Sequence, residues 1–141
     1  RHVQNAETVA RWLEAHPDVA TVSYSGLPSS PWYAAGQKYA PKGVGAVLSF
    51  ELKGGVDAGR ALVDSVELFS HVANIGDVRS LIIHPASTTH SQLTPEQQLT
   101  SGVTPGLVRL SVGLENIDDI IADLEAGFAA ARAVVAANAA V

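Results

Sequence analysis

Apolar residues in the first half of the chain predict a helix followed by two strands. Those of the opening segment recur at helical spacing: Val3, Ala6, Val9, Ala10 and Leu13. This helix should stop at His16, because proline at the next position disfavours helix in the residue before it. Residues 19–24 alternate as a short strand, and residues 45–52 (GAVLSFEL) form the clearest strand of this half. Between the strands, a short helix is expected to begin near Pro31 or Trp32 and to end before Pro41.

From Asp57 onward, the sequence carries more explicit signals for where helices and strands begin and end. Asp57 is expected to open a helix over residues 58–66, and residues 68–73 and 80–84 are apolar, β-branched stretches separated by a Gly-Asp turn. Thr94, followed by proline and by Gln97, predicts a capped helix that runs to about residue 102. Residues 107–112 form a strand, after which Asn116 caps a long helix. The apolar stripe of that helix consists of Ile117, Ile120, Ile121, Leu124 and Phe128.

These elements predict an α+β fold. One sheet of about four or five strands, with helices packed on one face, accommodates them all. Neither an internal repeat nor an interdomain linker is visible, so residues 1–141 are expected to form a single domain.

Arg109 is the most prominent candidate for chemistry. Alternation along residues 107–112 places Arg109 and Ser111 on the face opposite Val108 and Leu110. An arginine in an apolar strand must reach water or a carboxylate, and its planar fork suits bidentate binding of a carboxylate. From this pattern alone, a structural ion pair or a solvated strand face is favoured over ligand binding.

Two further segments are weaker candidates. Residues 74–77 (NIGD) have the composition of a turn whose glycine permits close approach of the backbone to a ligand, although an ordinary turn fits as well. His84 and His90 lie six residues apart among hydroxyl side chains, but this spacing matches no zinc motif. We therefore expect no metal site.

Composition narrows the class of protein. The chain is 47% hydrophobic and 16% charged, with a net charge of −5 and nine Lys and Arg residues. This balance is typical of a globular protein and disfavours nucleic acid as a partner. Cysteine is absent, which excludes a thiolate zinc site and a cysteine nucleophile within these residues. No apolar run approaches the roughly 20 residues that a membrane span needs, so a membrane partner is not expected.

Residues 69–128 resemble the C-terminal region of the Cys/Met-metabolism enzymes that depend on pyridoxal 5'-phosphate (PLP). The resemblance rests on two long motifs, HPASTTH at residues 84–90 and GLVRLSVGLE at residues 106–115. Residues 24–55 (YSGLPSSPWYAAGQKYAPKGVGAVLSFELKGG) resemble most closely the O-acetylhomoserine sulfhydrylase branch of this family. The resemblance implies the small C-terminal domain of a fold-type I PLP-dependent transferase, in which residues 1–16 end an interdomain helix.

The resemblance also implies roles for individual residues. The family's arginine in the VRLSVG strand grips the α-carboxylate of the substrate, and Arg109 occupies that position. A second contact comes from the turn at Asn74 and Ile75, where other branches show Ser-Leu-Gly. The sequence Asn-Ile-Gly at this turn is typical of the sulfhydrylase branch. Ser80, Thr89 and Ser111 are supporting candidates.

The implied enzyme makes homocysteine from O-acetylhomoserine and sulfide, or methionine when methanethiol is the thiol. It is expected to be a cytoplasmic homotetramer. In the family, PLP is attached to a lysine upstream of the matching region, and Lys38, Lys42 and Lys53 do not lie in that motif. We therefore expect the catalytic and cofactor-binding residues to lie outside this chain, which alone should be inactive and bind no PLP.

Two alternatives stay open. A sibling enzyme with the same domain is one: an O-succinylhomoserine sulfhydrylase, a cystathionine γ-synthase or a γ-lyase. The other is a non-catalytic module that binds an amino acid.

Overall fold

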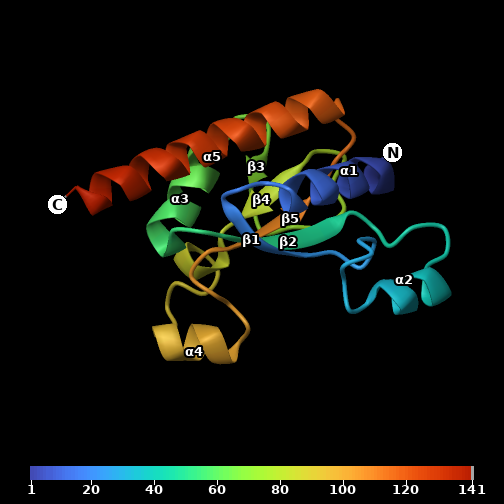
Figure 1. Cartoon of the computed structure of the whole chain (residues 1–141), viewed down its shortest axis with the longest axis horizontal. Helices are drawn as coiled ribbons and strands as arrows, with labels where there is room; N and C mark the ends of the chain where they lie inside the picture. Colours follow the sequence, from blue (N-terminus) through green and yellow to red (C-terminus); the bar gives the residue numbers. More distant parts are fainter. Residues whose placement is uncertain (141) are drawn as a thin grey trace.

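The computed structural model describes residues 1–140, which form one mixed five-stranded sheet and its covering helices (Figure 1). In chain order the elements are α1 (His2–Glu14), β1 (Val19–Ser23), α2 (Tyr33–Tyr39), β2 (Val47–Leu52), α3 (Gly55–Ser65), β3 (Ser70–His71), β4 (Leu81–Ile83), the 3₁₀ turn η1 (Pro85–Ser87), α4 (Pro95–Thr100), β5 (Leu107–Ser111) and α5 (Ile117–Ala139). The α+β fold predicted from the sequence is confirmed.

The sheet places β5 at its centre. The strand order is β1-β2-β5-β4-β3, with antiparallel pairing except between β3 and β4, which are parallel. Because β5 has a hydrogen-bonded neighbour on each side, a side chain on this strand is surrounded by the residues of β2 and β4. This central position determines the surroundings of Arg109.

Helices α1, α3 and α5 lie together on one side of the sheet, and the short helices α2 and α4 extend on the other side (Figure 1). Helix α5 runs along most of the long axis of the molecule and packs against α3 and α1 (Figure 1). The largest buried side chains, Phe50 of β2 and Phe128 of α5, meet in this core with ring centroids 5.8 Å apart. His16 stacks on Phe128 at 4.0 Å, which extends the aromatic packing to the segment after α1.

Local capping signals are confirmed at two helices. The Thr94 hydroxyl accepts from the Gln97 N–H at the start of α4, and the Gln97 side chain accepts from the Thr94 N–H in return. The Asn116 side chain accepts from the Asp118 N–H at 2.9 Å and begins α5. Each bond satisfies a donor that the first helical turn leaves unpaired.

Two expectations about element boundaries are corrected. Helix α3 begins at Gly55, so Asp57 lies in its first turn and does not cap it; Gly54, with φ of +102°, precedes the helix instead. Strand β3 covers two residues, because the backbone N–H groups of residues 67–69 bond to the Asp123 carboxylate of α5 and not to a strand. Among residues 1–140, no helix is both long and apolar enough to cross a lipid bilayer.

Candidate functional site

Arg109 lies at the middle of β5, on the sheet face opposite the three long helices. Its register partners are Ser49 of β2 and Ile83 of β4, while Val108 and Leu110 on either side of it are fully buried against the helices. The alternation predicted from the sequence is therefore confirmed. Arg109 itself is half-buried, so its long stem lies along the sheet and its guanidinium group reaches the surface.

The turn after β3 holds the Arg109 guanidinium group. Arg109 Nη2 donates to the Asn74 carbonyl at 3.2 Å, and the Asn74 side chain accepts from the Ile75 N–H at 2.8 Å. The Gly76 N–H donates to Ser111 Oγ at 3.2 Å. Three predicted site residues (Arg109, Asn74 and Ile75) are thus brought together, although they are about 35 positions apart in the sequence.

A groove opens on this face of the sheet beside Arg109. Its lining residues are Ser23, Val47, Leu48, Ser49, Pro85, His90, Ser101, Gly102, Val103, Leu107 and Arg109. They come from β1, β2 and β5, from the 3₁₀ turn and the segment between it and α4, and from the loop that follows α4. Arg109 is the one permanently charged side chain among them, so the groove presents a cation amid apolar and hydroxyl groups.

That combination suits a small anionic ligand. A guanidinium group has five N–H donors in a rigid fork, of which the Asn74 carbonyl takes one. The ion pairs within residues 1–140 involve Arg132, His16 and His71, and none involves Arg109. Within residues 1–140, the Asn74 carbonyl is the hydrogen-bond acceptor of the Arg109 guanidinium group, so its other donors can bind a carboxylate in bidentate fashion.

Two of the supporting candidates, Ser80 and Thr89, lie outside this groove. Ser80 is fully buried; its hydroxyl donates to Glu115 Oε2 at 2.8 Å and accepts from the Gly113 N–H at 2.9 Å, so it is occupied within the fold. Thr89 is exposed and hydrogen-bonded to His90 Nδ1 at 2.9 Å. It lines a separate hollow beside Ile83, with residues of β3 and the loop after it. The structure thus brings neither residue to the groove of Arg109.

Sequence reasoning missed several residues of the groove. Ser49 faces the groove because it pairs with Arg109, and Ser101 and Gly102 reach it from the end of α4. Strand pairing and the return of a loop to the sheet depend on tertiary structure, so no local pattern marked these positions. His90 was considered only as a metal ligand, and residues 1–140 contain no group of three or more potential metal ligands.

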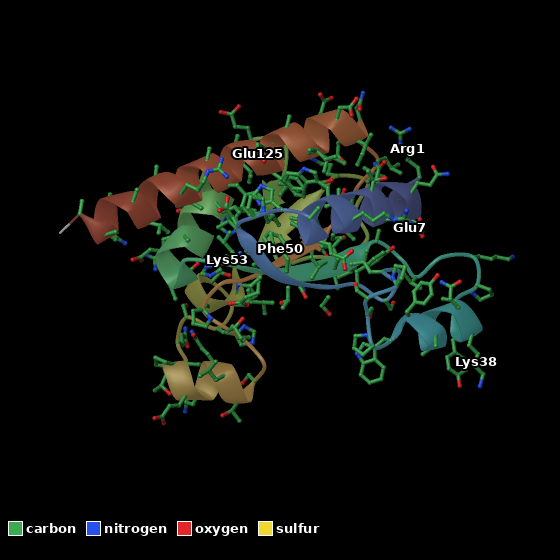
Figure 2. All side chains as sticks on the ribbon, in the orientation of Figure 1. Arg1, Glu7, Lys38, Phe50, Lys53 and Glu125 are labelled. Carbon is green, nitrogen blue, oxygen red and sulfur yellow. The ribbon has the colours of Figure 1, made fainter. Side chains whose placement is uncertain are left out.

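The residues present fit an anionic ligand but not the attachment of PLP. Lys38 lies at the outer end of α2, over the ring of Tyr39 and away from the sheet (Figure 2). Lys53 donates to the Pro17 carbonyl at 2.6 Å. None of the three lysines lines the groove of Arg109, so this groove offers no amine to a carbonyl cofactor.

These observations define an α+β domain with an arginine-bearing groove on the open face of its sheet. The chain belongs to the Cys/Met metabolism PLP-dependent enzyme family, whose model matches residues 1–129.

Among curated relatives, the chain is 56% identical to the O-acetyl-L-homoserine sulfhydrylase of Leptospira meyeri, an alignment that covers 89% of this chain and 28% of that protein. It is 51% identical to the L-methionine gamma-lyase of Fusobacterium nucleatum, in an alignment that covers 90% of this chain and 32% of that protein. The chain thus spans about a third or less of the length of these relatives.

Two solved structures have a fold similar to that of this chain. A putative O-acetylhomoserine (thiol)-lyase from Campylobacter jejuni, which carries a pyridoxyl-lysine, matches with a TM-score of 0.82 and 46% identity over 91% of this chain and 30% of that one. A cystathionine gamma synthase from Xanthomonas oryzae, in complex with cystathionine, matches with a TM-score of 0.84 and 42% identity. This match covers 94% of this chain and 34% of that one.

Proposed function

We propose that this chain is part of a PLP-dependent enzyme that makes homocysteine from O-acetylhomoserine and sulfide, and that it supplies the clamp for the α-carboxylate of the substrate. Membership of the family and similarity to several O-acetyl-L-homoserine sulfhydrylases support the reaction. The observation that carries the clamp is the Arg109 guanidinium group, held against the Asn74 carbonyl beside an open groove.

Arg109 acts by binding and orientation. Two parallel N–H bonds to a carboxylate fix both the position and the plane of that group. A clamp of this kind aligns the bonds that react at the neighbouring carbon, and such alignment can account for orders of magnitude in rate. The turn at Asn74 and Ile75 is the second part of the clamp, because the Asn74 carbonyl holds the guanidinium group.

The proposal extends to the organisation of the whole enzyme. Residues 1–141 would form one domain, with residues 1–16 ending an interdomain helix, and a separate PLP-binding part would contribute the cofactor lysine. The complete enzyme would be a cytoplasmic homotetramer, with methanethiol as a possible second thiol. The chain alone is expected to fold without turnover and without bound PLP, and the absorbance spectrum of the purified chain tests the second point.

The proposal is tested in the full-length enzyme with Arg109→Ala, Arg109→Lys and, as a matched control, Arg11→Ala on the exposed face of α1. Loss of the clamp should lower kcat/KM for O-acetylhomoserine with sulfide by at least about 100-fold. The Arg109→Lys variant should recover only part of the lost kcat/KM, because lysine keeps the positive charge but not the planar guanidinium group. The control should stay within about twofold of the unsubstituted enzyme, since surface changes away from the site have small effects.

Substrate comparison separates the branches of the family. Turnover of O-acetylhomoserine with sulfide should exceed turnover of O-succinylhomoserine, of cysteine as the thiol donor and of methionine in γ-elimination. A preference for any of these three would favour a sibling enzyme, which the 51% identity to a methionine gamma-lyase makes the second candidate. Activity indifferent to Arg109 would overturn the clamp itself.

A further inference from the structure

Strand β5 holds the Asn74–Gly76 turn at two points. Arg109 and Ser111 are two residues apart and therefore lie on the same face of the strand. Arg109 Nη2 donates to the carbonyl at the first residue of the turn, and Ser111 Oγ accepts from the N–H at the third. The turn and the guanidinium group consequently form one hydrogen-bonded unit on β5.

Ser111 does not reach the groove. Its side chain is 3% exposed, it pairs with Val47 and Leu81 on the neighbouring strands, and it is absent from the residues that line the groove. Its hydroxyl contacts the backbone of the turn instead. The hydrogen bond to Gly76 therefore links the Ser111 side chain to the turn that holds Arg109.

Gly76 lets the turn meet Ser111. Its φ of +80° lies in the left-handed region that a side chain disfavours, although a Cβ there would meet no atom within 4 Å. Gly76 is therefore needed for its backbone conformation and not for space. This conformation directs the N–H towards β5, while Asn74 presents its carbonyl to Arg109.

We propose that Ser111 is a positioning residue for Arg109, acting through the N–H of Gly76 to hold the Asn74 carbonyl against the guanidinium group. The inference rests on the proposed clamp function and deepens it. Without the Ser111 hydroxyl, Arg109 supplies the one remaining hydrogen bond between the turn and β5, so the guanidinium group samples orientations that no longer match the carboxylate.

The experiment uses the full-length enzyme and two substrates, O-acetylhomoserine and its analogue with a carboxamide in place of the α-carboxylate. The quantity measured is the preference for the carboxylate, the ratio of the two kcat/KM values. Ser111→Ala and Gly76→Ala are compared with two controls that make the same chemical change away from the groove. Ser65→Ala removes a half-buried hydroxyl at the end of α3, and Gly55→Ala introduces a side chain at another φ above +70°.

Ser111→Ala should lower the carboxylate preference about fivefold, mainly by raising KM for O-acetylhomoserine, since the loss corresponds to roughly one hydrogen bond. Hydrogen exchange of the peptide that contains Gly76 should become faster in the same variant. Gly76→Ala should reproduce both effects, and the controls should reproduce neither. Ser111→Cys, which keeps the size and a weak acceptor, should lie between alanine and serine.

These measurements distinguish the positioning role of Ser111 from the binding role of Arg109. An unchanged carboxylate preference in Arg109→Ala would overturn the proposed function. A preference lost in Arg109→Ala but kept in folded Ser111→Ala and Ser111→Cys would overturn the positioning role alone. An equal loss for both substrates would also overturn it, because that result shows a general structural effect. Adding Ser111→Ala to Arg109→Ala should cause no further loss of preference, since both act on one unit.

Discussion

His84 is a buried histidine whose two ring nitrogens are both satisfied within the fold. Nε2 lies 2.7 Å from the Pro105 carbonyl and Nδ1 lies 2.8 Å from Ser87 Oγ. Because a carbonyl only accepts, Nε2 carries the proton and Nδ1 accepts from the serine. The ring packs against Gly59 of α3, where any side chain would collide with it. His84 thus joins the 3₁₀ turn, the loop before β5 and the helical layer.

Stability should fall as His84 becomes protonated. Burial lowers the pKa of His84, and this outweighs the bond to Pro105, which raises it. At His84 the folded state therefore binds fewer protons than the unfolded state, so the contribution of this group to stability is fully present above about pH 6.5 and declines as the pH falls below that value. Urea unfolding of the chain at pH 7.5 and 5.5 measures this decline.

Comparison with His84→Asn isolates the contribution of this histidine. The variant should be less stable by about 1–3 kcal/mol at pH 7.5, because two buried hydrogen bonds are lost, and it should depend less on pH. His90→Gln serves as the matched control and should keep the pH dependence of the unsubstituted chain. A decline of the same size in His84→Asn would assign the effect to other groups.

At the scale of single residues, the sequence predicted the face of Arg109 but not the atoms around it. Alternation along one strand is enough to separate Arg109 from Val108, since it depends only on strand geometry. The bond from Arg109 to the Asn74 carbonyl depends on the return of a loop from another part of the chain. The same holds for Ser80, whose hydroxyl is directed to Glu115 by tertiary packing.

At the scale of elements, Asp123 fastens α5 to the segment before β3. Its carboxylate accepts from three consecutive backbone N–H groups, those of residues 67–69, at 2.8, 3.0 and 3.2 Å. Bonds to an ionised acceptor are stronger than neutral ones. A side chain of the last helix therefore takes the donors that a longer strand would have used.

Replacing Asp123 by alanine should lower the free energy of unfolding by about 2–3 kcal/mol, because three backbone donors lose a charged partner. The measurement is equilibrium urea unfolding at pH 7.5. Asp118→Ala, in the exposed first turn of the same helix, should cost less than about 1 kcal/mol, the usual size of a dipole contribution. Equal losses in the two variants would contradict the special role of Asp123.

The elements predicted well are those with complete local signals. The capping box at Thr94 and the Asn116 cap lie within a few residues of the groups they satisfy, so the sequence alone locates the helix starts. Strand β3 was predicted too long because the partner of its donors, Asp123, is more than 50 residues away. The start of α3 was misplaced because Asp57 was expected to cap the helix, whereas Gly54, in a left-handed conformation, precedes it and Asp57 lies in the first turn.

At the scale of the whole molecule, α1 is bonded to the segment that follows β5. Asn5 is buried, and its Nδ2 donates to the carbonyls of Gly113 and Glu115, both at 3.0 Å. His2 Nδ1 lies 2.8 Å from the Val112 carbonyl. Since Glu115 in turn binds the N–H of Ser80 at 2.6 Å, α1 is connected through this segment to the far end of the loop that contains Asn74.

Removing the Asn5 amide tests the connection between α1 and the loop that contains Asn74. Asn5→Ala should lower the free energy of unfolding by about 1–3 kcal/mol, because the buried Gly113 carbonyl loses its donor, whereas the Glu115 carbonyl keeps Arg1 Nη2. It should also speed hydrogen exchange in residues 74–80, to which α1 is connected by hydrogen bonds through Glu115. Gln4→Ala, on the exposed side of α1, is the matched control and should change neither quantity beyond about 0.5 kcal/mol. Destabilisation without faster exchange in residues 74–80 would show that α1 supports the core but not the loop beside Arg109. Faster exchange confined to that loop and to α1 would instead identify the segment after β5 as the physical link between the first helix and the clamp.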